Sequence, residues 1–443
     1  MNIRLSDHFN YGKLIRFTLP SIGMMLFMSV YGVVDGFFVS NFVGKTAFAS
    51  VNLVMPFINV LGGMGAMLGV GGSALVAKTL GEGDPHRAGR YFTMLMKTMV
   101  LVSIVFTVLG VAFIRPVAYL LGATDDMISD CVLYARVVLL FSIFMHMQYQ
   151  FQSYLIVAEK PNLGLIVTIA AGCTNMALDA LFVGVFRWGI AGAAVATGMS
   201  QMVGGMIPLV WFFSKRNRSN LHFTKTDMEW KPILKACGNG ASEMLSSVSG
   251  SIVGMLYNLQ LMKYAGEDGV AAYGVVMYAA FIFIAVMMGY ANGSSPIVGY
   301  HFGAKNREEM HNILKKSMIL LVSTGAVLTG TGIVLAKPIA RLFVGYDANL
   351  MEITVRAFRI CSAPFVIMGI GMYTSSFFTA LNDGVVSMEM SSLRALVFPL
   401  ITVITLPLLF RLDGVWYSLV GSEILSVGAA LIFLKVKQKK YGY

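Results

Sequence analysis

Apolar segments long enough to cross a bilayer recur along the whole chain. A transmembrane helix needs about 20 mostly apolar residues to cross a hydrocarbon core about 30 Å thick. Runs of this length predict membrane-spanning helices, so the chain is predicted to be an all-α integral membrane protein. We predict twelve spans, near residues 14–40, 47–72, 92–112, 131–157, 163–186, 190–213, 236–262, 270–298, 317–336, 354–380, 388–410 and 414–434.

The composition agrees with a membrane location and argues against several other classes of protein. Hydrophobic residues make up 57% of the chain and charged residues 12%, whereas soluble domains contain about 25% charged residues. The net charge of +11 is spread over short loops, so no nucleic-acid partner is expected. The cysteines lie far apart without a C-x-x-C pair, and neither a structural metal site nor a disulfide framework is predicted. No cofactor and no enzymatic activity are expected.

A sequence stretch in the first half returns in the second half. Gly71 to Gly81 reads G-G-S-A-L-V-A-K-T-L-G, and Gly293 to Gly303 reads G-S-S-P-I-V-G-Y-H-F-G. The same offset aligns two further pairs, Arg115-Pro116 with Lys337-Pro338 and Ser200-Gln201 with Ser422-Glu423. Each copy holds six predicted spans, an even number, so both copies enter the membrane from the same side as parallel repeats. We therefore predict two pseudo-symmetric six-helix lobes around a central cavity.

The polar segments set the expected lobe boundaries and the orientation. Residues 1–213 are predicted to form an N-terminal, cation-binding lobe, 214–235 a cytoplasmic linker, and 236–443 a C-terminal lobe. With the N-terminus inside, most of the 33 Lys and Arg residues fall on the cytoplasmic side, as the positive-inside rule requires. We expect a multi-pass protein of the cell membrane, in a bacterial plasma membrane, with both termini in the cytoplasm.

Acidic side chains inside predicted spans are the first candidates for function. Asp35 and Asp179 reach similar depths in the first and fifth spans, and Thr197 arrives at the same depth in the sixth. Asn175 lies one helical turn from Asp179, and Tyr31 one turn from Asp35. Ionisable groups in spans usually mark ion pathways. The pair can carry a proton or hold Na⁺, and the structural alternative is that each carboxylate only bonds to the other's helix. No other metal site is predicted.

The second copy has no acid at the positions that match Asp35 and Asp179, so coupling is expected to belong to the first half. The second half carries Glu243 in the seventh predicted span instead. Three interpretations of Glu243 stay open: a second proton site, a contact for a cationic substrate, or an interfacial residue paired with Lys235.

Arg394 is a cation inside the eleventh predicted span. We interpret it as a structural intramembrane charge that pairs with Glu389 or with Glu423, which lies near the middle of the twelfth span.

Polar residues at every second position, His146, Gln148, Gln150 and Gln152, mark the fourth predicted span. A helix cannot place them all on one face. One or two, with Gln150 and Gln152 as candidates for substrate contact, are expected to line the central cavity. The others are expected to bond to neighbouring helices, and His146 is interpreted as a hydrogen-bonded core residue.

Several of these landmarks resemble the multidrug and toxic compound extrusion (MATE) transporters. The six-plus-six layout, L-G-E-G-D at Leu80 to Asp84, P-I-V-G-Y-H-F-G-A-K-N at Pro296 to Asn306, and N-x-x-x-D at Asn175 and Asp179 carry the resemblance. It extends over essentially the whole chain.

The resemblance implies roles for particular residues. Tyr31, Asp35, Asn175, Asp179 and Thr197 match the cation-binding cluster of the DinF-like branch of the family. By the same resemblance, Pro20 marks the place where helix 1 bends, Glu243 the helix 7 acid and Arg394 the helix 11 arginine. The tenth span has no deep acid, because Asp383 falls at its cytoplasmic end, so no sodium site is carried over to the second lobe.

The activity implied by the resemblance is secondary active antiport. The protein is expected to export organic, often cationic and amphipathic, drugs or toxic compounds in exchange for H⁺ or Na⁺, by rocking of the two lobes. Small organic molecules and the lipid bilayer are the expected partners, and a monomer is expected. The alternative is a flippase of related fold that moves lipid-linked or amphipathic lipid substrates, which would need a wide cationic cavity.

Overall fold

The computed structural model describes residues 3–215 and 217–443, apart from the side chain of Lys45. Helices form nearly all of the described chain, and these residues contain no strand. The first half consists of α1 (Tyr11–Phe38), η1 (Val39–Val43), α2 (Lys45–Gly81), α3 (Pro85–Leu120), α4 (Ile128–Leu140), α5 (Ser142–Val157), α6 (Pro161–Asp179), η2 (Ala180–Val185) and α7 (Gly189–Phe213). The η segments are π-helices that continue the preceding α-helix.

The second half contains fewer but longer helices. They are α8 (Trp230–Gly303), α9 (Arg307–Val344), α10 (Ala348–Ser362), α11 (Phe365–Ala380), α12 (Gly384–Ser392), η3 (Leu393–Val397) and α13 (Phe398–Tyr441). Non-helical backbone at Gly266 (φ 61°) divides α8 into two spans. At Arg411 (φ 52°) it divides the continuous run of α12, η3 and α13 (Gly384–Tyr441) into two spans. With these divisions, and with α4–α5 and α10–α11 each counted as one span, the described residues contain the twelve predicted spans.

Two spans that were predicted as single helices are bent in the middle. α4 and α5 meet at 55°, and α10 and α11 meet at 50°. At the second bend Pro364 precedes α11, and a proline has no backbone N–H for the helical ladder. At the first bend the Phe141 ring lies against Gly198 of α7. Each bent pair is, taken together, long and apolar enough to form one span.

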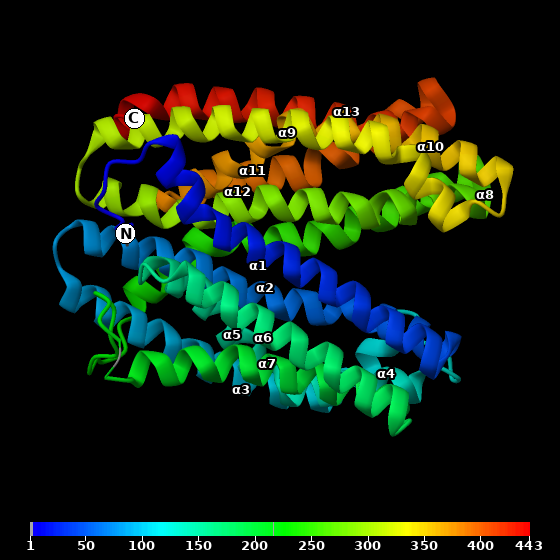
Figure 1. Ribbon diagram of the computed structural model, residues 1–443, viewed down its shortest axis with the longest axis horizontal. Coiled ribbons are helices and arrows are strands. Elements are labelled where there is room, and N and C mark those ends of the chain that lie inside the picture. The colour runs from blue at the N-terminus through cyan, green and yellow to red at the C-terminus, as the bar shows by residue number, and fades with distance from the viewer. Residues whose placement is uncertain (1–2, 216) are drawn as a thin grey trace.

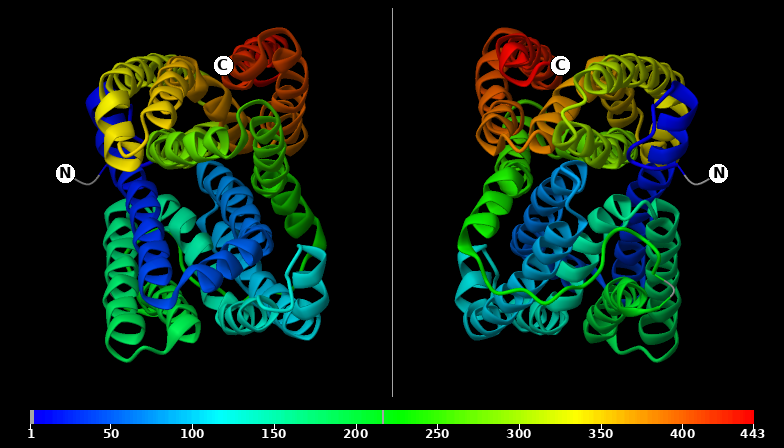
Figure 2. Two further views of the ribbon diagram at one scale, coloured as in Figure 1. Left: turned by 90° about the vertical axis from the view of Figure 1, so that its right-hand side faces the viewer. Right: turned by 90° about the vertical axis from the view of Figure 1, so that its left-hand side faces the viewer.

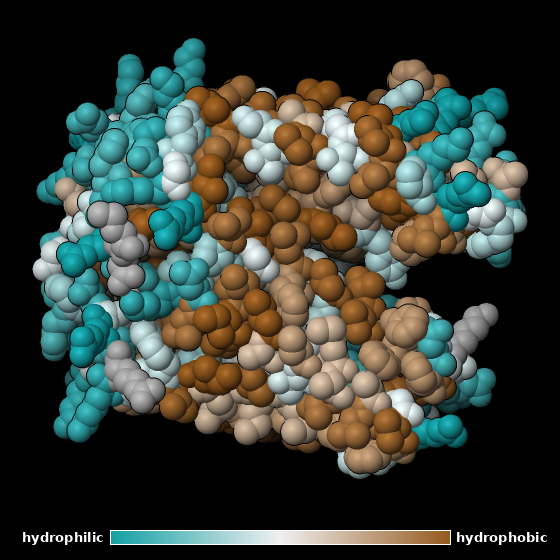
Figure 3. Space-filling view, in the orientation of Figure 1, coloured by the Kyte–Doolittle hydropathy of each residue, from teal (hydrophilic) through white to brown (hydrophobic). Residues whose placement is uncertain are grey.

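The helices form two bundles that lie side by side (Figure 1). Figure 2 shows α1 reaching from one bundle towards the other along one edge of the molecule. Both termini lie at the same end (Figure 1). Figure 3 shows hydrophobic residues over the middle of the molecule, hydrophilic residues at both ends, and a cleft between the bundles that opens at the end away from the termini.

At the end that holds the termini, glycines close the seam between α2 and α8. A Cβ built on Gly81 would lie 3.0 Å from the backbone nitrogen of Ala304, and one built on Gly303 would lie 3.1 Å from that of Glu82. The two contacts are reciprocal, because Gly81 and Gly303 are the repeat partners found in the sequence. Glycine lets the two backbones touch where any side chain would hold them apart.

The connection between the halves packs against α3. The backbone N–H of Thr224 donates to Thr93 Oγ1 at 2.9 Å, and Arg90 forms an ion pair with Glu229 at 2.6 Å. Leu221 is fully buried. α8 begins at Trp230, earlier than the predicted seventh span.

Candidate functional site

Asp35 lies near the end of α1, where small residues bring α1 and α6 together. A Cβ built on Gly172 of α6 would lie 2.9 Å from the Tyr31 ring. This close approach presses Tyr31 and the next turn of α1 against α6. Asp35 is consequently buried, with 9% of its surface exposed. A carboxylate this deep in an apolar bundle is costly unless another group compensates for it.

Asp179 is the last residue of α6 before η2 and is fully buried. Single π-helical turns inside α-helices are frequent at functional sites. The carboxyl groups of Asp35 and Asp179 interact with each other, and Asp35 also interacts with Thr197 of α7. The structure therefore brings together the two aspartates and the threonine that the sequence placed at one depth.

This pair lies among buried oxygen atoms that have no hydrogen-bond partner in the described part of the chain. They are Asp35 Oδ1, Asn175 Oδ1, Asp179 Oδ1 and Oδ2, Thr197 Oγ1 and the Tyr134 hydroxyl. Buried polar atoms in native structures almost always have a partner. Among the described residues no Lys or Arg forms an ion pair with either aspartate. A set of oxygens of this kind fits a proton shared between the carboxylates or a hard cation such as Na⁺.

The cluster also includes two tyrosines that the sequence analysis did not identify. Tyr134 of α4 interacts with Asp35, Asp179 and Thr197, and Tyr149 of α5 interacts with Tyr31. α4 lies at the end of the molecule away from the termini (Figure 1), and the interaction of Tyr134 with Thr197 puts the two side chains at one depth. That shared depth was the available signal, but tyrosine is common in membrane helices and the spacing alone did not distinguish it.

His146 has partners on both sides of its ring. Nε2 donates to the Leu61 carbonyl at 2.9 Å, and Nδ1 lies 2.8 Å from Ser103 Oγ. The residue is fully buried. These contacts join α2, α3 and α5 and agree with the interpretation of His146 as a hydrogen-bonded core residue.

The glutamines of α5 point to different neighbours. Gln152 Nε2 lies 3.4 Å from Thr168 Oγ1 of α6 and 3.3 Å from Met28 Sδ of α1. Gln148 lies against Gly204 of α7. Gln150 is fully buried and its amide has no hydrogen-bond partner among the described residues. Among these polar residues of α5, Gln150 is thus the one whose side-chain amide is available to bind a ligand.

Arg394 makes no ion pair with Glu389 or Glu423 in the described structure, which differs from the pairing expected from the sequence. Its aliphatic stem lies on Gly371 of α11 instead. Arg394 belongs to the π-helical segment η3, which rotates it relative to Glu389 on α12. Glu243 does not form the proposed ion pair with Lys235 either.

Pro20 lies inside α1, which continues through it as one helix. The turn that follows is held by the second span of α8, where a Cβ on Gly289 would lie 2.9 Å from the Ile22 backbone nitrogen. One turn further, a Cβ on Gly293 would lie 2.9 Å from Ser21 Cβ. α1 therefore contacts α6 at the aspartates and α8 of the second half at Pro20.

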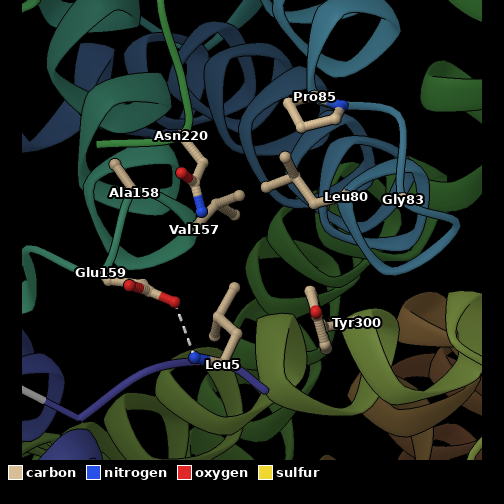
Figure 4. Close-up of a pocket in the computed structure, with 9 residues that line it drawn as sticks. All are labelled: Leu5, Leu80, Gly83, Pro85, Val157, Ala158, Glu159, Asn220 and Tyr300. Carbon is tan, nitrogen blue, oxygen red and sulfur yellow. Dashed lines mark hydrogen bonds between the residues drawn. The ribbon is translucent and has the colours of Figure 1, made fainter. Parts of the chain in front are cut away.

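A small cavity of about 240 Å³ lies at the closed end of the molecule (Figure 4). The N–H of Leu5 donates to Glu159 Oε1 at 2.7 Å across it. Burial raises the pKa of Glu159, which lies in the turn between α5 and α6. Phe9 donates through its backbone to Glu309 of α9 at 2.8 Å. The N-terminal segment thus links both halves at this end.

A profile of the MatE family matches the chain twice, over residues 20–181 and 244–405. The chain belongs to the MatE family. The two matches cover the two copies that the internal repeat predicted, and they confirm the resemblance to multidrug and toxic compound extrusion transporters.

Known MatE-family proteins resemble the chain over nearly its full length. The Multidrug export protein MepA of Staphylococcus saprophyticus is 21% identical over 433 residues, which cover 96% of this chain and 94% of that protein. A solved MATE structure in complex with MaL6 superposes with a TM-score of 0.92 and 21% identity, over 98% of each chain. An outward-facing multidrug resistance MATE family transporter superposes with a TM-score of 0.91 and 23% identity, over 98% of this chain and 97% of that one.

The family assignment agrees with the expectation that the protein is a membrane transporter and not an enzyme. The structural neighbours share the MATE fold.

Proposed function

We propose that this MatE-family chain is a secondary active antiporter that exports organic, often cationic and amphipathic, compounds in exchange for H⁺ or Na⁺. The observation that carries the proposal is the meeting of Asp35 and Asp179, buried together with oxygens that lack donors. The names of the relatives, multidrug export proteins, support drug-like compounds as substrates.

The coupling ion acts on the repulsion between the two carboxylates. Two like charges in an apolar bundle repel strongly, because the low dielectric screens them little. A proton or Na⁺ between Asp35 and Asp179 removes the repulsion and holds α1 on α6. Loss of the ion pushes the helices apart.

α1 transmits this change to the second half. Gly289 and Gly293 of α8 hold the turn of α1 beside Pro20. A shift of α1 near Pro20 therefore changes its contact with α8, and the two lobes rock to close the outer cleft and open the seam at the termini. Residues 1–213 and 236–443 are the proposed moving units, joined by the connection at 214–235.

The membrane potential is sufficient to drive export. Each charge that enters across 100 mV supplies about 2.3 kcal/mol, which corresponds to a gradient of about fifty-fold for a fully coupled substrate. In the proposed orientation both termini face the cytoplasm and the cleft faces outward, so ions reach the aspartates from outside. The transporter works as a monomer, since each chain contains both lobes.

Efflux from proteoliposomes tests the proposal. Vesicles with purified protein and tetraphenylphosphonium receive first a proton gradient and then a sodium gradient at constant pH. Export driven by one of the gradients is expected, and its loss in Asp179→Asn. No export with either gradient would contradict the proposed function.

A further inference from the structure

The second half holds charged side chains inside the membrane that the cation site does not use. Glu423 of α13 has 7% of its surface exposed, and its Oε2 has no hydrogen-bond partner among the described residues. Arg394 Nε and the fully buried Ser426 hydroxyl also lack partners there. Such groups are expected to bind something, because an unpartnered buried polar atom is destabilising.

These groups lie together around Gly371 of α11. A Cβ built on Gly371 would lie 2.6 Å from Ser426 Oγ and 3.1 Å from Arg394 Cδ. Glu423 is three residues before Ser426 on α13 and therefore shares its helix face. Arg394 lies within electrostatic range of Glu423 and of Glu243 on α8. Three helices and the π-helical segment η3 thus bring one cation and two carboxylates together.

The charges of this cluster do not balance. Arg394 supplies one positive charge against the carboxylates of Glu243 and Glu423, and it forms an ion pair with neither of them. A buried charge needs a partner at hydrogen-bonding distance to offset its desolvation. One further positive charge would complete the cluster. The Asp35–Asp179 site differs, because it contains two carboxylates and no basic side chain among the described residues.

Two tyrosines lie on the α8 side of Glu423. The Tyr257 hydroxyl is within electrostatic range of the Glu423 carboxylate, and the Tyr257 ring stacks on the Tyr273 ring with centroids 5.5 Å apart. Carboxylates next to aromatic rings suit organic cations, whose charge is diffuse and whose body is apolar. The described residues contain no group of three or more acidic, Cys or His side chains that could hold a metal ion.

We propose that Glu423 binds the positive charge of the exported compound, and that Arg394 is a built-in counter-charge which makes the site one for organic monocations. The inference rests on the proposed function, and it places the binding sites for the coupling ion and for the organic cation in separate lobes. The coupling ion binds at Asp35 and Asp179, and the organic cation binds at Glu423.

Equilibrium binding to the full-length protein in lipid nanodiscs tests this assignment. The probes are radiolabelled tetraphenylphosphonium and a neutral tetraphenyl compound of the same size. Glu423→Gln removes one carboxylate and leaves one positive charge, Arg394, and one negative charge, Glu243, in the cluster, so the variant is expected to fold. It should bind tetraphenylphosphonium at least about tenfold more weakly, equivalent to about 1.4 kcal/mol, and the neutral probe as tightly as wild type.

Two further variants make the test specific. Glu352→Gln removes an exposed carboxylate from α10 and should leave both affinities unchanged. Glu423→Asp keeps the charge and should retain most of the binding of the cation. If Glu423 had only a structural role, Glu423→Gln would instead weaken the binding of both probes to the same extent.

The outcomes separate this inference from the proposed function. Unchanged tetraphenylphosphonium binding in Glu423→Gln, an equal loss for both probes, or no binding to wild type would overturn the assignment of Glu423. The coupling role of Asp35 and Asp179 is judged independently, by gradient-driven efflux of any substrate from proteoliposomes.

Discussion

Gly71 on α2 and Gly240 on α8 meet backbone to backbone, so that a Cβ built on Gly71 would lie 2.9 Å from the Gly240 Cα atom. Gly293, the repeat partner of Gly71, makes the equivalent contact with α1, where its built Cβ would lie 3.3 Å from Thr18 Cα. The two contacts close the same end of the molecule from both halves. A seam of this kind has to separate when the cleft changes sides.

Gly240→Val should hold this seam open. The added side chain meets the backbone of Met67, which cannot move aside without separating α2 from α8. Cys237, one turn earlier on α8, should then react several times faster with a membrane-impermeant maleimide, measured in a Cys173→Ser background. Gly254→Val on the same helix is the control, because nothing lies within 4 Å of its built Cβ. Equal reactivity of Cys237 in both variants would show that the seam does not depend on the glycine contact.

Gly172→Val should abolish transport without preventing membrane insertion. The valine displaces Phe27 and Tyr31, so α1 moves away from α6 and Asp35 loses its position opposite Asp179. Gly184→Val in η2 has open space around its Cβ and should transport normally. The measurement is dye efflux from energised vesicles at matched protein levels. Normal efflux by Gly172→Val would show that coupling tolerates a wider gap between α1 and α6.

His146→Leu should reduce stability and leave coupling intact. The change removes the hydrogen bonds of the His146 ring to the Leu61 carbonyl and the Ser103 hydroxyl, at a cost of about 1–3 kcal/mol for the two together. A lower thermal unfolding midpoint in detergent is therefore expected, with an unchanged pH profile of efflux. A shifted pH profile at unchanged stability would instead assign a proton-transfer role to His146.

Asp383 should make stability pH-dependent at the closed end. Burial favours a higher pKa for this carboxyl, but hydrogen bonds from Tyr441, Val386 and Lys440 outweigh it and hold the pKa below its usual value. A carboxylate with a depressed folded-state pKa stabilises the fold above the unfolded-state pKa of about 3.9, and the contribution is lost as pH falls through the folded-state pKa.

The variant Asp383→Asn isolates this effect, because asparagine caps α12 as well as aspartate does. It should unfold at a slightly lower temperature at pH 7. The free energy of unfolding should fall by no more than about 1 kcal/mol, because the group is partly exposed. The difference from wild type should stay nearly constant from pH 7 to about 4 and shrink below that, as the pH falls through the folded-state pKa of Asp383. A difference that stays constant below about pH 4 would exclude the charge of Asp383 as its cause.

The sequence predicted the fold closely, because apolar length and repetition act over whole segments. The described residues contain all twelve predicted spans, and the breaks at Gly266 and Arg411 fall between predicted spans. The bend after Leu140 was not predicted, since it has no proline or glycine and depends on packing against α7. The π-helical segments carry no sequence signal, so the expected pairing of Arg394 with Glu389 ignored the rotation that η3 introduces.

The sequence could predict which residues of the cation site lie at the same depth in the membrane. Asp35, Asp179 and Thr197 were placed at one level by counting residues, and the structure brings them into contact range. Their partner Tyr134 was missed, because the orientation of α4 depends on its bend with α5. Which side chains face each other follows from helix packing, and the spacing of residues in one helix does not contain that information.

In the proposed mechanism Asp35 and Asp179 together hold one coupling ion that exchanges with the exported compound. Addition of tetraphenylphosphonium to purified, weakly buffered protein measures this directly, by a pH indicator for proton release and by displacement of radioactive sodium. Wild type and Asp126→Asn, which alters an exposed loop carboxylate, should each release one ion per chain. Asp35→Asn and Asp179→Asn should release none. Full release by either of these two variants would contradict the account.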